Sequence, residues 1–156
     1  MNRAVSMAQR TIIGVIGAAS ADAATLKSAE AIGRLIGKRR ALLLCGGLGG
    51  VMEAAARGAK AVGGTTIGIL PQSDRDSANP YIDIPIATGF SEGRNVIIAR
   101  AADALIAVGG EYGTLSEIAF ALKMGKKVVG LRTWDIKGVI KAESEEDAVA
   151  WVIHEK

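Results

Sequence analysis

An apolar run that passes through a glycine-rich turn into an amphipathic stretch constrains this chain more than any other feature. The apolar run covers 104–108, the turn reads Gly109-Gly110-Glu111-Tyr112-Gly113, and the amphipathic stretch continues to Met124. This order predicts a buried strand that turns into a helix. Glycines let backbone N–H groups approach a ligand, and a helix N-terminus favours an anion. The turn therefore predicts a phosphate site, with Glu117 about one helical turn further on.

The rest of the chain alternates between apolar runs and helical patterns. Further strands are predicted at 11–18, 41–45, 65–70 and 127–131, with a short extended segment at 82–88 and a polar loop at 72–80. The predicted helices cover about 22–37, 51–62, 91–101, 113–124 and 145–154, the first capped by Ser20 or Asp22 and the last by Ser144. This alternation predicts an α/β fold in three layers around a mostly parallel sheet.

Three glycine-rich turns follow predicted strands, at 17–20, 46–50 and 109–114. In the common doubly wound order, the strands at 11–18 and 102–108 are neighbours at the switch point of the sheet. Their turns then face one crevice, and the turn at 46–50 lies one strand away. We expect the three turns to converge on one ligand site.

Composition excludes several classes of protein. With 156 residues the chain fits one domain, 11–156, after an N-terminal extension at 1–10. The net charge of +3 is scattered, which argues against nucleic-acid binding. One cysteine excludes an intrachain disulfide, one histidine leaves no classical zinc cluster, and we expect no metal site. No apolar run approaches a membrane span, so we expect a cytoplasmic protein without membrane partners.

Two common nucleotide motifs are absent. The chain has no G-x-G-x-x-G followed by an acidic ribose ligand, and no P-loop. Cys45 ends a strand, but no histidine in a site-facing turn would activate it, so we interpret it as a small buried hydrophobe. Trp134 is either a stacking partner for a base or a structural contact.

Four motifs, in order, resemble the LONELY GUY proteins, long mislabelled as lysine decarboxylases. Residues 110–117 (GEYGTLSE) are similar to their P-G-G-x-G-T-x-x-E signature, and Arg94 stands where the first residue of their R-K pair does. The turn at 17–20 is similar to their G-S-S turn, and 45–52 (CGGLGGVM) to Y-G-G-G-x-x-G-L-M. The resemblance covers about residues 12 to 131.

This resemblance implies a Rossmann-like fold, a homo-oligomer (dimer or tetramer), and hydrolysis of the N-glycosidic bond of nucleoside 5′-monophosphates, without a required cofactor. Arg94 and Glu117 would correspond to the two catalytic residues, because a fixed carboxylate stabilises the cationic ribosyl centre that forms during cleavage. The residues implied to hold the phosphorylated ligand are Gly17, Ala19, Ser20, Gly46, Gly47, Gly110, Gly113 and Thr114.

The sequence also departs from the family pattern. Gly109 replaces proline, Glu111 replaces a glycine, Asn95 replaces lysine, and Glu53 replaces a small residue. The site thus loses one positive charge and gains negative charge, which disfavours a nucleoside monophosphate. These changes resemble a branch of short bacterial proteins related to molybdenum-cofactor carrier proteins. The alternative to hydrolysis is therefore a non-catalytic carrier that binds the molybdenum cofactor or a similar phosphate ester.

Structural explanations compete with these roles. Thr114 and Glu117 have the spacing of a capping box, in which Thr114 would cap the helix. Arg94, near the positive end of a predicted helix, needs either a bound anion or an acidic partner such as Glu92 or Glu117. The glycines at 46–50 would serve helix packing, ligand contact or both.

Overall fold

The computed structural model describes residues 9–154. Its strands are β1 (Ile12–Gly17), β2 (Leu42–Cys45), β3 (Thr65–Leu70), β4 (Ile84–Ala87), β5 (Ala104–Val108), β6 (Lys127–Leu131) and β7 (Ile140–Lys141). Its α-helices are α1 (Ala23–Lys38), α2 (Val51–Ala61), α3 (Arg94–Ala101), α4 (Tyr112–Lys123) and α5 (Glu145–Val152). The N-terminal extension expected at 1–10 lies, up to residue 8, outside the described residues.

All seven strands form one parallel sheet in the order β4-β3-β2-β1-β5-β6-β7. β1 pairs with both β2 and β5, so the chain order reverses at β1, as the sequence predicts for a doubly wound sheet. Gly17 at the end of β1 stands opposite Val108 at the end of β5. The glycine-rich turns that follow these two strands therefore begin side by side.

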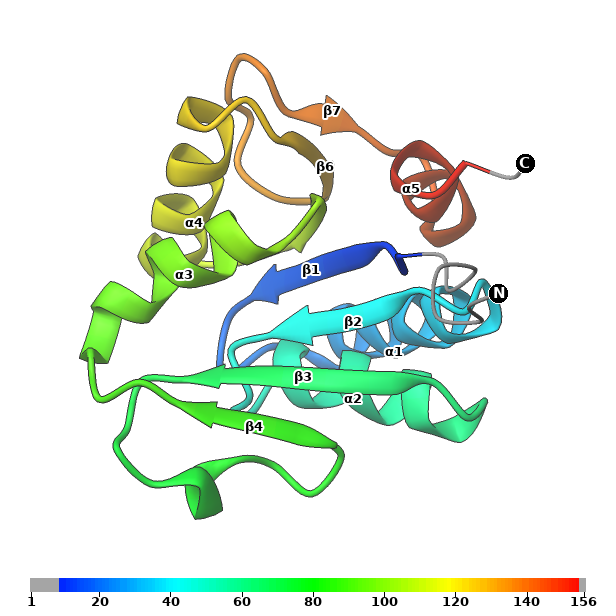
Figure 1. Ribbon diagram of the computed structural model, residues 1–156. Helices are drawn as coiled ribbons and strands as arrows, with labels where there is room; N and C mark the ends of the chain where they lie inside the picture. The colour runs from blue at the N-terminus through cyan, green and yellow to red at the C-terminus, as the bar shows by residue number, and fades with distance from the viewer. Residues whose placement is uncertain (1–8, 155–156) are drawn as a thin grey trace, which may run out of the picture.

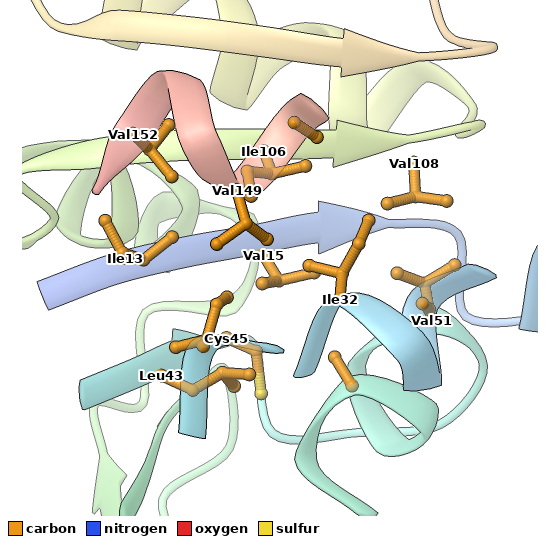
Figure 2. Packing of buried hydrophobic residues seen from close by; sticks show 14 of the residues in the cluster. Ile13, Val15, Ile32, Leu43, Cys45, Val51, Ile106, Val108, Val149 and Val152 are labelled. Carbon is orange, nitrogen blue, oxygen red and sulfur yellow. The ribbon is translucent and has the colours of Figure 1, made fainter. Parts of the chain in front are cut away.

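Helices cover both faces of the sheet (Figure 1). On one face, residues of α1, α2 and α5 pack on β1, β2, β5 and β6, and Figure 2 shows Ile32 and Val149 meeting Val15 and Ile106 there. On the other face, residues of α3 and α4 form a second cluster that includes Ile98, Ile118 and Leu105. The expected three-layer α/β fold is confirmed, and the sheet is wholly parallel rather than mostly so.

Glycines bring α1 and α2 into backbone contact. A Cβ added to Gly33 would lie 1.9 Å from the Ala55 carbonyl oxygen, and one added to Gly58 would lie 2.0 Å from that of Glu30. The alanines of α2 are buried against this neighbour, including Ala55 and Ala59. The alanine-rich face of α2 therefore packs against α1 within the same chain.

Gly33→Ala should destabilise the protein by about 1–3 kcal/mol, because the new methyl group forces the two helices apart and outweighs the gain in helix propensity. Urea denaturation would measure the loss. Lys27→Ala, an exposed substitution on the same helix, should change stability by less than about 0.5 kcal/mol. Equal stabilities for the two variants would contradict the close packing.

The predicted caps of the first and last helices are found. The Asp22 carboxylate accepts a hydrogen bond from Thr25 N (2.8 Å), and the Ser144 hydroxyl accepts one from Asp147 N (3.0 Å). The last helix ends at Val152, two residues before the predicted end at 154. The two-residue strand β7 was not predicted, and the polar loop at 72–80 contains a 3₁₀ turn at Arg75–Ser77. Within the described residues, no helix combines the length and apolarity needed to cross a bilayer.

Candidate functional site

A pocket of about 330 Å³ lies where the turns after β1, β2 and β5 meet, at the carboxyl ends of these strands. This is the edge at which open parallel sheets bind ligands. The lining comes from each of the three turns, from the start of α3 and from the first two turns of α4. The pocket is lined by Val15, Ile16, Gly17, Ala18, Ala19, Ser20, Gly46, Leu48, Met52, Arg94, Asn95, Glu111, Gly113, Thr114 and Glu117.

The turn after β5 directs an uncapped helix N-terminus at the pocket. Gly109 (φ 57°) and Gly110 (φ 111°) have left-handed backbone that glycine tolerates, and a Cβ at Gly110 would lie 2.5 Å from Thr114. The helix begins at Tyr112, and its N-cap residue Glu111 makes no side-chain capping bond. The first N–H groups of α4 therefore remain available to an anion.

The capping-box interpretation of Thr114 and Glu117 is wrong. Because α4 begins at Tyr112, Thr114 lies inside the first turn rather than at the cap position. Thr114 is 2% exposed and Glu117 is 6% exposed, and both line the pocket. Their side chains face the cavity instead of the helix N-terminus, so a cap does not explain either residue.

The turns after β1 and β2 are packed against each other. Val51 N donates to Ala18 O (3.0 Å), and a Cβ on Gly50, whose φ is 62°, would lie 2.3 Å from the same oxygen. A Cβ on Gly46 would lie 2.6 Å from Arg94 Nη2. The glycines of this turn therefore serve close packing and also make room for the cation of the pocket.

Arg94 is the first residue of α3, and its guanidinium contacts three neighbouring residues. Its Nε donates to Ile69 O (2.9 Å), its Nη1 donates to Asn95 Oδ1, and its Nη2 lies 4.0 Å from Met52 Sδ. Burial lowers the pKa of Arg94, an effect that the nearby Glu117 carboxylate opposes. No ion pair within 4.0 Å joins Arg94 to Glu92 or Glu117 in the described part of the chain, so N–H groups of Arg94 are left for a ligand.

Glu117 is a buried carboxyl that faces the same cavity. No hydrogen bond to the Glu117 side chain is found within the described residues. Every fully buried side-chain nitrogen or oxygen among these residues does have a hydrogen-bond partner. Its oxygens therefore keep the solvent contact that the pocket provides. Burial raises the pKa of Glu117 to about 8, although the positive charge of Arg94 lowers it. The raised pKa favours the protonated carboxyl near neutral pH.

Cys45 lies beneath the pocket and does not line it. It is fully buried, its Sγ accepts from Gly47 N (3.4 Å), and burial raises the pKa of the thiol to about 12. These surroundings agree with the predicted small hydrophobe.

Iodoacetamide at pH 8 should leave Cys45 unmodified in the native protein and alkylate it in urea, because the thiol is buried and its pKa is raised. Mass spectrometry would measure the extent of alkylation. Rapid labelling of the native protein would contradict this burial.

Most residues predicted for the site lie together. Gly17, Ala19, Ser20, Gly46, Gly113, Thr114, Arg94 and Glu117 line the pocket, whereas Gly47 and Gly110 do not. These two glycines, both with positive φ, shape the turns instead. Leu48 and Met52 also line the pocket, and their apolar side chains give no signal of ligand contact in the sequence. Asn95 and Glu111 line it too, although in the sequence they stand out only as changes of charge.

Trp134 stands outside this lining. Its ring centroid is 6.0 Å from that of Tyr112, and its Nε1 donates to Glu111 O (3.2 Å). The tryptophan thus supports the residue that precedes α4. These contacts favour the structural alternative over stacking on a base.

The fold and the pocket define a class of protein: a Rossmann-like α/β protein whose candidate ligand site lies at the switch point of a parallel sheet. The chain belongs to the SLOG cluster4 family, whose model matches residues 10–156.

Known relatives place the chain more closely within this class. It is 50% identical to an uncharacterised protein of Archaeoglobus fulgidus, over 90% of this chain and 93% of the other. The molybdenum cofactor binding protein of Rippkaea orientalis matches with a TM-score of 0.88 and 38% identity, covering 92% and 96% of the two chains. The molybdenum cofactor carrier protein of Chlamydomonas reinhardtii matches with a TM-score of 0.82, 38% identity and the same coverage. The expected likeness to carrier proteins is thus confirmed.

Proposed function

We propose that this protein binds the molybdenum cofactor, or a similar phosphorylated pterin, and carries it without converting it. The observation that supports this most is the uncapped N-terminus of α4 beside the half-buried Arg94 guanidinium in one pocket. A phosphate monoester accepts hydrogen bonds from both groups, and its charge is favoured by the helix dipole and by the cation. The similarity to proteins that bind this cofactor favours a pterin over a nucleotide.

The dimensions of the site support a ligand larger than phosphate. The volume of the pocket, about 330 Å³, lies at the lower end of the range that is typical of small-molecule sites. A second hollow of about 590 Å³ adjoins it and shares Arg94 as a wall, with Ser73, Ser91 and Glu92 among its other lining residues. A ligand anchored by its phosphate at α4 has room to extend past Arg94 into this polar hollow.

A direct loading experiment tests the proposal. The purified protein is incubated without oxygen with molybdenum cofactor released from a molybdoenzyme, and passed through a gel-filtration column. We expect molybdenum and the fluorescent oxidation product of the pterin to elute with the protein in equal amounts. The bound cofactor should also restore activity to a cofactor-free molybdoenzyme. A protein peak without molybdenum would refute the proposal.

A second candidate is the hydrolysis of nucleoside 5′-monophosphates, the activity of the LONELY GUY proteins. It is favoured by the position of Glu117, which shares the pocket with Arg94. The raised pKa of Glu117 opposes it, because the carboxyl must be ionised to stabilise a cationic ribosyl centre. Glu111 does not separate the two candidates, because its carboxylate stands at the start of α4, where both of them place the phosphate. The similarity to carrier proteins supports binding without chemistry better than hydrolysis.

An assay of base release separates the two candidates. The protein is incubated with a panel of nucleoside 5′-monophosphates, including adenylate and a cytokinin monophosphate, and free base is measured. Release that disappears in Glu117→Gln would assign hydrolysis and give the carboxyl a catalytic role. If no base is released while the cofactor binds, the carrier proposal stands.

A further inference from the structure

We infer that Asn95 is a positioning residue that fixes the Arg94 guanidinium and ties it to the phosphate-binding turn of α4. This inference rests on the proposed function, because it concerns how the same pocket holds its ligand. Sequence comparison presents Asn95 only as the loss of a lysine, whereas the structure gives its side-chain amide two partners.

The amide of Asn95 is the centre of a continuous hydrogen-bonded chain. Its Oδ1 accepts from Arg94 Nη1, and its Nδ2 donates to Ser116 Oγ at 3.1 Å. Ser116 Oγ in turn donates to Gly113 O at 2.6 Å, in the first turn of α4. At the other end, Arg94 Nε donates to Ile69 O at 2.9 Å. The chain therefore connects β3, the start of α3 and the first turn of α4.

Burial makes the arrangement specific to an amide. Asn95 is 5% exposed, so its oxygen and its nitrogen both need partners inside the protein. Asparagine supplies an acceptor toward the cation and a donor toward Ser116, which no apolar residue and no lysine at this position provides. A lysine here would place a second positive charge against Arg94 and would remove the acceptor.

The contacts account for the orientation of Arg94. An arginine side chain has several rotatable bonds, and holding it in one geometry costs conformational entropy when a ligand binds. The Ile69 carbonyl and the Asn95 amide hold Nε and Nη1 before any ligand arrives. Because the same amide reaches Ser116, the guanidinium and the helix N-terminus keep a fixed separation, which pre-organises both groups for one phosphate.

A double-mutant cycle on affinity for the molybdenum cofactor tests this inference. Asn95→Ala should weaken binding about tenfold in the wild-type background and by less than about twofold when Arg94 is already alanine. Ser116→Ala, which breaks the far end of the chain, should weaken binding by about two- to threefold. Thr66→Val is the control, because it removes buried side-chain hydrogen bonds to Tyr81 and Asp83 away from the pocket and should leave affinity unchanged.

Side-chain NMR of Arg94 supplies a readout that does not depend on the ligand. We expect separate, slowly exchanging Nη–H signals in the wild type and in Thr66→Val, and averaged Nη–H signals in Asn95→Ala, because Asn95 is the partner of Nη1. Equal signals in wild type and Asn95→Ala would overturn the inference. So would an equal loss of affinity from Asn95→Ala in both backgrounds, because Asn95 would then act independently of Arg94.

The two proposals fail in different ways. If the wild-type protein binds no cofactor, the proposed carrier function is refuted, and the Arg94 signal still decides whether Asn95 orders the guanidinium. If the cofactor binds and the cycle shows no coupling, the carrier function stands and the positioning role of Asn95 is refuted.

Discussion

Arg94→Ala should weaken binding of the molybdenum cofactor by about 10- to 100-fold, the range expected when a charge-assisted hydrogen bond is removed. Arg94 contributes a half-buried cation to the lining of the pocket, and its bonds to Ile69 and Asn95 do not use all of its N–H groups. Removing it leaves the phosphate without a cation, although the N–H groups of α4 and polar groups such as Ser20 still line the pocket. It also takes positive charge away from Glu117, whose pKa should rise further. Equilibrium binding at pH 7 and fixed ionic strength would measure the loss.

Arg57→Ala is a matched control because it changes the net charge by the same amount. Arg57 lies on α2, where it pairs with Glu30 at 3.2 Å, and it does not line the pocket. Its loss should leave the affinity within about twofold of wild type. Arg94→Lys should give an intermediate affinity, since the charge stays while the bonds to Ile69 and Asn95 are lost. Equal affinities for wild type and Arg94→Ala would remove Arg94 from the ligand site.

The layers of the fold were predictable because the central strands have a clear hydrophobic pattern in the sequence. β1 and β5 are covered on both faces, so they appear in the sequence as unbroken apolar runs. β7 has only two residues, one of them exposed, and follows an irregular segment. Its place in the sheet depends on its pairing with β6, which no local pattern reveals.

The pocket was predictable as far as backbone chemistry determines it. Glycine-rich turns at the ends of adjacent strands have to meet, and they do so at Gly17, Gly46 and Gly113. The contacts of individual side chains were harder to predict from the sequence. The spacing of Thr114 and Glu117 fits a capping box, but two left-handed glycines bring the chain into the helix earlier and bury both side chains.

The stability of the protein should fall as the pH rises from about 5 to about 8, and Glu117→Gln should remove this dependence. Burial raises the pKa of Glu117 from 4.5 to about 8. Between these values the unfolded chain loses the proton and the folded protein keeps it, so folding becomes less favourable by about 1.4 kcal/mol for each pH unit. Above pH 8 both states are ionised, and the accumulated cost reaches up to about 5 kcal/mol.

Urea denaturation of both proteins between pH 5 and pH 9 would measure this effect as a difference, which cancels the contributions of other titrating groups. Glutamine has nearly the shape of protonated glutamic acid, so the two proteins should be similarly stable near pH 5. Glu117→Gln should then become the more stable protein as the pH approaches 8, with a constant advantage above it. Parallel stability curves would mean that Glu117 ionises normally in the folded protein. A free carboxylate would then face the phosphate at pH 7, and the carrier proposal would have to place the phosphate farther from α4.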